Sequence, residues 1–245
     1  MKIASYNLHF GGDTGADNHW QRLNSEFLPD FICAQESLHP SKYFSPEAFA
    51  EFKGCIHSNV HHGRWGSAIL SRSHVLEAVT LGLPEFDGWV VGAMVPDFMI
   101  GGISQSVLIL SIHAPSPGPY ESRVSRMLEV ITQKWGKIPM IIVGDFNITT
   151  AIRLSGEELQ NTAGEIKILN RMKNELGVFN AWQHLHPNDA LPQTLRWSNK
   201  PELPYHCDGV FLSESFLPHL AGAEIVGNGV WGSMSDHNPI VVSLI

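Results

Sequence analysis

The segment PMIIVGDFNIT, residues 139–149, ends a run of four apolar residues on a glycine and two polar side chains. Gly-Asp and Asn are common turn formers, so a turn at the end of a buried strand is one explanation. The other explanation is chemical: a rigid strand holds the carboxylate of Asp145 and the amide of Asn147 at a site. The residues at the other strand ends decide between the two.

Polar residues of the same few types stand at the ends of several other apolar runs. Taken singly, each has an ordinary explanation, because strands commonly end in solvated carboxylates or polar turns. Their repetition instead predicts one edge of the fold that carries oxygen ligands and imidazoles. The residues are Asn7 and His9, Gln35 and Glu36, His113, His206 and Asp208, and the triplet Asp236, His237 and Asn238.

The carboxylates and amides at this edge suit a hard cation. Mg²⁺ and Mn²⁺ take oxygen ligands from one or two carboxylates, from waters and from a substrate phosphate. Glu36 and Asp236 supply such ligands, together with the amide oxygen of Asn7 or of Asn147. The sequence has no HExxH pattern and no cysteine joins this set, so we do not expect a dedicated zinc site.

Imidazoles beside carboxylates supply acid–base groups that work near neutral pH. We expect Asp208 to orient His237, as a third group orients the base in nucleophilic triads. The sequence has no GxSxG motif, and Cys33 has no adjacent base. A metal-assisted attack by water is therefore favoured over a covalent mechanism.

Short apolar or β-branched runs bounded by turn residues predict ten strands. Several of them, such as 107–110 and 140–143, are apolar on both faces, which is expected of strands in a sheet covered on both sides. We therefore expect a layered α/β sandwich. The predicted strands are 2–8, 30–36, 67–72, 74–81, 89–95, 106–114, 140–146, 207–213, 223–227 and 239–245.

Three helices are expected between these strands. In 119–135 the apolar residues recur at helical spacing and form one stripe. A weaker stripe in 162–176 stops at Gly177, a helix-ending residue, and a third helix over 17–28 ends before a proline. No repeat or linker interrupts the chain, so we expect one domain over residues 1–245.

The composition limits the classes of partner and compartment. The formal net charge is −8 with only 16 Lys and Arg, which disfavours binding to duplex DNA through contacts with many phosphates. It leaves a phosphate-bearing substrate open, because bound cations neutralise clustered carboxylates. The three cysteines lie far apart, which fits a reducing, cytoplasmic location. With no apolar run of membrane-spanning length, we expect no membrane span.

Seven segments, taken in order, resemble the endonuclease/exonuclease/phosphatase family. GDFN or SDH alone would be a weak signal, whereas all seven in order are specific and span residues 6 to 239. The resemblance implies a deoxyribonuclease I-like four-layer α/β/β/α sandwich, with two mainly antiparallel sheets and helices outside. The segments are YNLH (6–9), QE (35–36), GSAILSR (66–72), LSIHAPSPGPYESR (110–123), GDFN (144–147), TLRW with YHCDGVFLS (194–197 and 205–213) and SDHNP (235–239).

The resemblance also implies a metal site. Glu36 would be the main ligand of Mg²⁺ or Mn²⁺, helped by Asn7 and, from the other side, by Asp236. Some branches of the family carry an acidic ligand two positions after the first Asn, where this chain has His9. This difference argues against a second metal and for a substrate contact by His9.

The remaining implied roles are catalytic. Asp145 would orient or deprotonate the attacking water, and Asn147 would hold a phosphate oxygen. His237, paired with Asp208, would contact the phosphate as the acid–base group. His113 lies where family members place a phosphate-contacting His or Tyr.

Further residues are candidates for substrate contact. The segment 57–65, HSNVHHGRW, precedes a strand near the predicted site, and substrate contact by His62 or Arg64 is a better expectation for it than a zinc or nickel cluster. His206 precedes the strand that carries Asp208. Trp197 has a side chain on which a nucleobase can stack.

The sequence therefore predicts a divalent-metal-dependent phosphoesterase, favouring a nuclease that cleaves phosphodiester bonds of nucleic acid with activated water. A phosphatase or phosphodiesterase acting on a nucleotide, inositol, sugar or lipid-headgroup phosphate is the alternative, and the low basic content supports it. A non-catalytic binding protein on the same fold is the third hypothesis, because a fold does not determine function. The sequence indicates no obligate protein partner.

Overall fold

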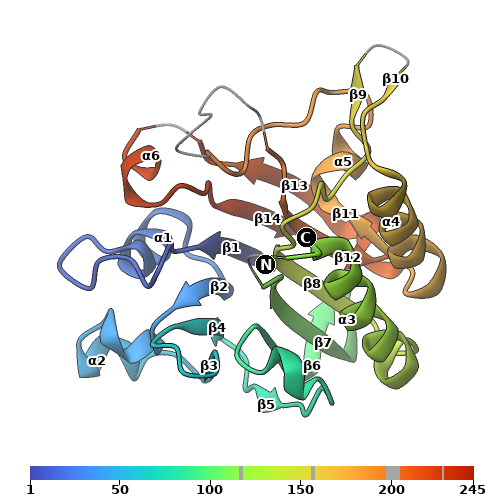
Figure 1. The fold of residues 1–245 in the computed structure, drawn as a ribbon. Coiled ribbons are helices and arrows are strands. Elements are labelled where there is room, and N and C mark those ends of the chain that lie inside the picture. The colour runs from blue at the N-terminus through green and yellow to red at the C-terminus, as the bar shows by residue number, and fades with distance from the viewer. Residues whose placement is uncertain (116–117, 156–157, 197–204, 228) are drawn as a thin grey trace.

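The computed structural model describes residues 1–115, 118–155, 158–196, 205–227 and 229–245, in which two six-stranded sheets lie face to face (Figure 1). Across the first sheet the strands are β13 (Leu220–Ile225), β14 (Ile240–Leu244), β1 (Lys2–Asn7), β2 (Phe31–Ser37), β4 (Gly66–Ser71) and β3 (Gly54–Asn59). Across the second they are β11 (Val178–Asn180), β12 (Asp208–Ser213), β8 (Met140–Asp145), β7 (Ile103–His113), β6 (Val90–Ile100) and β5 (Glu77–Ala78). The short strands β9 (Leu154–Ser155) and β10 (Glu158–Leu159) pair with each other.

Parallel pairing joins β1 to β2 and β7 to β8, near the middle of each sheet, and the other paired strands of the described chain are antiparallel. Helices lie outside the sheets, with α3 and α4 together over one outer face (Figure 1). The predicted four-layer sandwich of mainly antiparallel sheets is therefore confirmed. The helices are α1 (His19–Phe27), α2 (Pro46–Phe49), α3 (Tyr120–Trp135), α4 (Ala163–Glu175), α5 (Ala181–Leu185) and α6 (Trp231–Met234).

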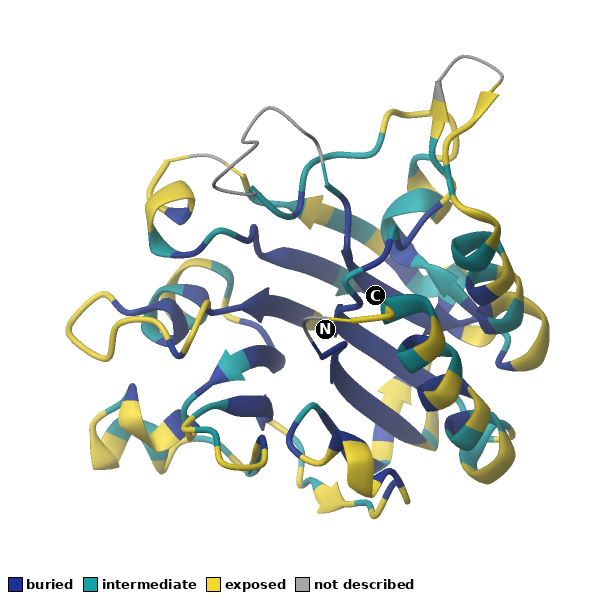
Figure 2. Cartoon of the chain, in the orientation of Figure 1, coloured by how far each residue is buried: buried dark blue, intermediate teal, exposed yellow. Residues whose placement is uncertain are grey.

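Apolar side chains fill the spaces between the layers, and the central strands of the two sheets are the most deeply buried elements (Figure 2). Between the sheets, residues such as Ile3 and Ile141 belong to one fully buried cluster. The predicted stripe of α3, including Met127 and Ile131, packs on the outer face of the second sheet. Among the described residues, no helix is long and apolar enough to cross a bilayer.

The element predictions hold for nine strands and three helices, with shifted ends, and fail at residues 74–81. Within this segment only the two residues of β5 form a strand, which pairs with β6, and Val75 is 61% exposed. The segment lies at the sheet edge, so its β-branched pattern finds a partner along only two residues. The sequence also failed to predict β3, a strand whose polar residues include His57, because its apolar alternation is short.

Gly144 shapes the end of β8, directly before Asp145. Its φ is +134°, and a Cβ there would overlap the carbonyl oxygen of Ile112 on the neighbouring parallel strand. The glycine therefore permits both a left-handed backbone and a close approach of β7, which fixes the direction of Asp145.

Gly144→Ala is expected to lower the free energy of unfolding by at least about 3 kcal/mol, because the strand must move away from a backbone atom. In a chain of this size that corresponds to a fall of about 6–12 °C in Tm, measured by circular dichroism or calorimetry. Gly222→Ala is the matched control, since a Cβ at Gly222 meets nothing nearer than 3.9 Å. Equal Tm changes in the two variants would contradict the steric argument.

Candidate active site

The central strands of the two sheets end at the same edge of the sandwich and bring the polar strand ends together. In the second sheet, Asp145 is the register partner of both His113 on β7 and Asp208 on β12. In the first sheet, Asn7 on β1 pairs with Gln35, next to Glu36. The Nδ2 of Asn7 donates to the Oδ2 of Asp145 at 3.1 Å and so joins the two sheets.

Asp145 lies at the centre of this edge and is 2% exposed. Its Oδ1 accepts a hydrogen bond from the backbone N–H of Asn147 at 2.9 Å, which defines the turn after β8. Burial raises the pKa of this carboxyl, and the nearby Asp208 raises it further, whereas His237 and the hydrogen bonds lower it. A carboxylate whose pKa is raised toward neutrality is suited to take a proton from water.

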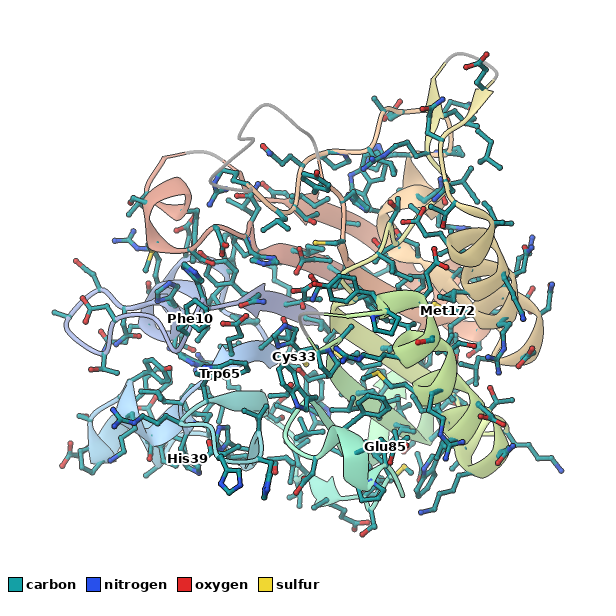
Figure 3. The ribbon with its side chains drawn as sticks, in the orientation of Figure 1. Phe10, Cys33, His39, Trp65, Glu85 and Met172 are labelled. Atoms are coloured by element: carbon teal, nitrogen blue, oxygen red, sulfur yellow. The ribbon has the colours of Figure 1, made fainter. Side chains whose placement is uncertain are left out.

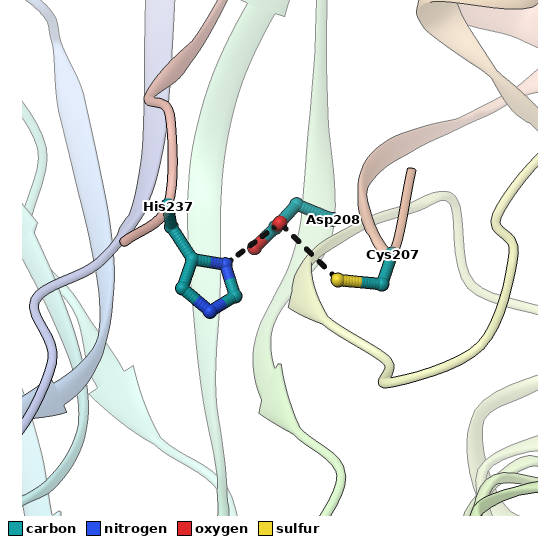
Figure 4. Close-up of side chains that lie close together, drawn as sticks. All are labelled: Cys207, Asp208 and His237. Atoms are coloured by element: carbon teal, nitrogen blue, oxygen red, sulfur yellow. Dashed lines mark hydrogen bonds and ion pairs between the residues drawn. The ribbon is translucent and has the colours of Figure 1, made fainter. Parts of the chain in front are cut away.

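His237 faces Asp145 and is held from behind by Asp208. Its Nδ1 lies 2.9 Å from the Oδ2 of Asp208 (Figure 4), and its Nε2 lies 3.7 Å from the Oδ2 of Asp145. Burial alone lowers the pKa of His237, but the charges of Asp208 and Asp145 outweigh burial and raise it. The ring is therefore an imidazolium whose Nδ1–H is bound by Asp208, while its Nε2–H is directed toward the reacting edge.

Cys207 stands beside this pair, with its Sγ 3.6 Å from the Oδ2 of Asp208 (Figure 4). Ligand-type atoms of Cys207, Asp208 and His237 all lie within 4.8 Å of one another. Burial raises the pKa of the thiol well above its ordinary value, so the sulfur is protonated and is no thiolate ligand. We interpret the three residues as a hydrogen-bonded group that supports His237.

Glu36, Asn7 and Asp236 form the all-oxygen set in which a hard divalent cation would be held. Glu36 and Asp236 line the same cavity, with side chains 13% and 34% exposed. The Oδ1 of Asn7 accepts the backbone N–H of His9 at 3.0 Å and keeps a second lone pair. Two carboxylates and an amide oxygen, open to solvent on one side, fit Mg²⁺ or Mn²⁺ with its waters.

Backbone strain is concentrated in this site. Four residues of the cavity have positive φ without being glycine: His9 (53°), Phe10 (57°), Glu36 (52°) and Asn147 (52°). The left-handed turn at Phe10 directs its backbone N–H onto the Oε2 of Glu36 at 2.7 Å. Such conformations persist only where the surrounding structure enforces them, and they are typical of functional sites.

His113 is enclosed by the rings of Trp65 and Trp89, with centroids 5.8 and 5.0 Å away. Its Nε2 lies 3.7 Å from both the Oε1 of Glu36 and the Oδ2 of Asp145. Burial lowers the pKa of His113 to about 3, and the charge of His237 contributes to the shift. His113 is therefore a neutral ring beside the two carboxylates.

A cavity of about 610 Å³ opens above these residues. Eight of the predicted site residues line it: His9, Glu36, His113, Asp145, Asn147, His206, Asp236 and His237. Asn7 and Asp208 stand directly behind, hydrogen-bonded to lining residues. Arg64 is exposed and is not among the lining residues, and Trp197 lies outside the residues that the structure describes.

Several residues that line the cavity are not among the site residues predicted from the sequence. Phe10 and Trp65 form an aromatic contact at the cavity, 6.2 Å apart (Figure 3), and Phe10 is 68% exposed. Arg153 lines the cavity from the segment after β8, and Tyr205 lies beside His206. Phe10 and Trp65 adjoin motif segments and Tyr205 belongs to one, but this signal does not separate lining from packing, and Arg153 adjoins no motif.

Arg196 was also missed, although it holds the loop that carries the catalytic histidine candidate. Its guanidinium donates to the backbone carbonyls of Ser235 and His237, and to the side chain of Asn238. Its backbone N–H donates to the carbonyl of Asp236 at 2.6 Å. Arg196 therefore positions the 235–238 loop, and its place in the TLRW segment was the signal for it.

His206 is buried and neutral. Burial lowers its pKa to about 4, because it outweighs the hydrogen bond to Pro192 and the charge of Asp208, which raise the pKa; the charge of Arg153 adds a smaller lowering. In the unfolded chain the ring takes up a proton near pH 6.5, whereas the folded protein resists protonation until about pH 4. The folded state is therefore expected to lose stability as the pH falls between these values, and to be unaffected by this group above them.

His206→Asn removes this sensitivity to acid. The free energy of unfolding of the wild type, minus that of the variant, is expected to decrease by about 2–3 kcal/mol from pH 7 to pH 4. Urea unfolding at a series of pH values measures this difference. His184→Asn, at an exposed histidine, is the control and should show a nearly constant difference. A constant difference for His206→Asn as well would contradict the lowered pKa.

The family model for the endonuclease/exonuclease/phosphatase family matches residues 4–237. No curated protein matches the sequence. Similar solved structures include the 3′ phosphatase NExo from Neisseria bound to product DNA hairpin, with a TM-score of 0.73, 18% identity and coverage of 100% of this chain and 99% of that chain. An AP endonuclease from Archaeoglobus fulgidus has a TM-score of 0.69, 18% identity and coverage of 100% and 99%.

The catalytic domain of APE2 from Xenopus laevis is also similar, with a TM-score of 0.75, 15% identity and coverage of 100% of this chain and 91% of that chain. At these identities the structural likeness shows the deoxyribonuclease I-like fold. The family match extends over nearly the whole chain and confirms the resemblance seen in its motifs. The chain belongs to the endonuclease/exonuclease/phosphatase family.

Proposed function

We propose that the protein is a divalent-metal-dependent hydrolase that cleaves phosphodiester bonds of nucleic acid with an activated water. One observation carries the proposal: Asp145 and the Asp208–His237 pair face each other across 3.7 Å at a cavity that Glu36 and Asp236 also line. This arrangement combines a general base, an acid and a set of oxygen ligands, which are the parts that phosphoester hydrolysis by water requires.

Asp145 is the base in this mechanism. It takes a proton from a water whose oxygen bonds to phosphorus, while the bond from phosphorus to the leaving oxygen breaks. His237, as an imidazolium, donates its Nε2 proton to the leaving oxygen. Solvent then takes up the proton held by Asp145 and returns a proton to His237, so that the site is reset with one water consumed.

Asn147 and His113 hold the phosphate during this step. The Nδ2 of Asn147 donates to the carbonyl of Ala114 at 2.8 Å, which fixes the side chain at the cavity wall. Donors aimed at the phosphate oxygens stabilise the charge that develops there. The Asn7, Glu36 and Asp236 set would hold a divalent cation, which supplies Lewis-acid stabilisation of the same charge.

His9 and His206 are the proposed substrate contacts, because both line the cavity. Two of the similar structures support nucleic acid as the substrate: by their descriptions, one is a 3′ phosphatase bound to product DNA hairpin and another is an AP endonuclease. A small phosphate ester is the second candidate, since the net charge of −8 provides little positive surface for duplex DNA and a cavity of about 610 Å³ accommodates a small ligand.

A turnover panel tests the proposal. Single-stranded and duplex oligonucleotides, an oligonucleotide with an abasic site, and soluble phosphate esters are incubated with enzyme and either Mg²⁺, Mn²⁺ or EDTA. We expect oligonucleotide cleavage that EDTA abolishes and that His237→Ala lowers by at least about 100-fold. If the oligonucleotides stay intact while a soluble phosphate ester is cleaved, the result supports the second candidate function, hydrolysis of a small phosphate ester. Activity of His237→Ala equal to the wild type would overturn the site assignment.

A further inference from the structure

Phe10 is a large apolar side chain that stays exposed where it lines the cavity. It is 68% exposed and lies beside Trp65, another lining residue (Figure 3). Its backbone is left-handed, with a φ of 57°, a conformation that a bulky residue rarely adopts. A strained backbone that leaves an aromatic ring in solvent does not strengthen the core, so packing does not account for the position of this ring.

The backbone of Phe10 holds its ring close to the reacting groups. Its N–H donates to the Oε2 of Glu36 at 2.7 Å. The Oε1 of Glu36 lies 3.7 Å from the Nε2 of His113, which lies equally far from the Oδ2 of Asp145. A phosphate ester bound at these carboxylates therefore has Phe10 within reach of the group that it carries.

Aromatic rings line one side of the cavity from the reacting groups to Phe10. The ring of Trp65 lies 5.8 Å from that of His113 and 6.2 Å from that of Phe10. Trp89 packs edge-on against Trp65 at 5.4 Å and holds its ring in place. These four residues, the aromatic wall, connect the buried catalytic edge with solvent.

The exposed ring of Phe10 suits a flat group of the ligand. Its contacts with His9 and Trp65 have interplanar angles of 41° and 60°, so neither is a parallel stack. A nucleobase stacks on such a ring, and this contact requires neither a charge nor a particular base. Stacking therefore suits a chain that has only 16 Lys and Arg for contacts with phosphates. Neighbouring bases cover the faces of a base inside a duplex, so the ring selects an unpaired base.

We infer that Phe10, supported by Trp65, stacks on one unpaired nucleobase adjacent to the scissile phosphate. The inference rests on the proposed function and deepens it, since it assigns single-stranded or terminal nucleotides as the substrate class. The phosphate is bound at the catalytic edge, and the base extends along the aromatic wall toward solvent.

Three variants test the role of the ring. Phe10→Leu keeps an apolar side chain and the backbone N–H that Glu36 accepts, but it lacks an aromatic face. Leu28 adopts the same left-handed backbone, with a φ of 48°, so leucine is compatible with this conformation. Phe10→Trp keeps an aromatic face. Phe179→Leu, the control, makes the same change at a half-buried residue of β11 that is not among the lining residues. All variants are checked for folding by circular dichroism.

The first measurement is binding, with Ca²⁺ in place of Mn²⁺. The probe is a single-stranded oligonucleotide with one 2-aminopurine, a base whose fluorescence is quenched by stacking. The wild type and Phe179→Leu are expected to quench the probe on binding. Phe10→Leu should raise the Kd about 10-fold and lose most of the quenching, whereas Phe10→Trp should keep both near the wild-type values.

The second measurement is cleavage with Mn²⁺. The substrates are single-stranded oligothymidylates with one cleavable phosphodiester, analogues with an abasic residue on either side of it, and the same strand in a duplex. For the wild type we expect kcat/KM to fall about 10-fold when one of the two bases is removed, and about 10-fold in the duplex. Phe10→Leu should reduce the preference for the base to within about threefold, and Phe179→Leu should keep it. This ratio cancels any effect of a variant on metal binding.

The outcomes distinguish the inference from the proposed function. If the wild type cleaves both abasic analogues as well as the complete strand, or if folded Phe10→Leu keeps the full preference, the inference is wrong while the hydrolase function stands. Equal cleavage of single strand and duplex would overturn the selection of unpaired bases. If no ester is cleaved with any metal, the proposed function fails, and the binding measurement still decides the inference: quenching that Phe10→Leu loses supports stacking, and its absence from the wild type overturns it.

Discussion

Asp145→Asn is expected to lower kcat by about 10³-fold, with little change in KM. The carboxylate is the base in the proposed step, and an amide cannot take a proton from water. Its environment is otherwise suited to an isosteric change, because the Oδ1 would still accept the backbone N–H of Asn147. The variant also removes a buried charge whose burial opposes ionisation, so the fold should be retained.

The measurement is a steady-state comparison on the substrate identified by the panel, with thermal unfolding as a check on folding. Asp97→Asn is the matched control, since Asp97 is exposed on β6, away from the cavity lining. The control should keep wild-type kcat. If the Asp145→Asn enzyme is folded and its kcat is within about threefold of the wild-type value, Asp145 is not the general base.

Glu36→Gln is expected to weaken metal binding by at least about 10-fold and to lower kcat at fixed Mn²⁺ by at least about 100-fold. The substitution keeps the length of the side chain and an oxygen that can accept from the backbone of Phe10. It removes the negative charge, which is the main attraction for a hard cation. Excess Mn²⁺ should restore part of the activity, because the remaining oxygens still bind it.

Calorimetric titration of Mn²⁺ into the protein without substrate tests the metal site independently of catalysis. Glu224→Gln, at an exposed residue of β13, is the control and should leave the affinity unchanged. If Glu36→Gln binds Mn²⁺ as tightly as the wild type, Glu36 is no metal ligand. That result would leave the proposed role of Asp145 as the base untouched, because Asp145→Asn tests a different group.

The sequence was sufficient to predict the sandwich, most strands and the identity of the polar strand ends. These features are local: apolar runs, turn residues and the types of side chain that follow them can be recognised without knowing the partners of a strand. The prediction at 74–81 failed because pairing depends on a neighbour, and this edge segment has one along only two residues. Arg64 was expected at the substrate for its place in the chain, yet it is not among the lining residues.

The sequence alone thus determined which residue types carry the chemistry and in which order they follow, since covalent order and hydrophobic pattern are already present in the chain. Only the tertiary structure decided how they are paired: Asn7 with Asp145 across the sheets, Asp208 with His237, and Cys207 beside them. It also decided the directions in which the pKa values shift, because burial and the distance between charges exist only after the sheets have packed.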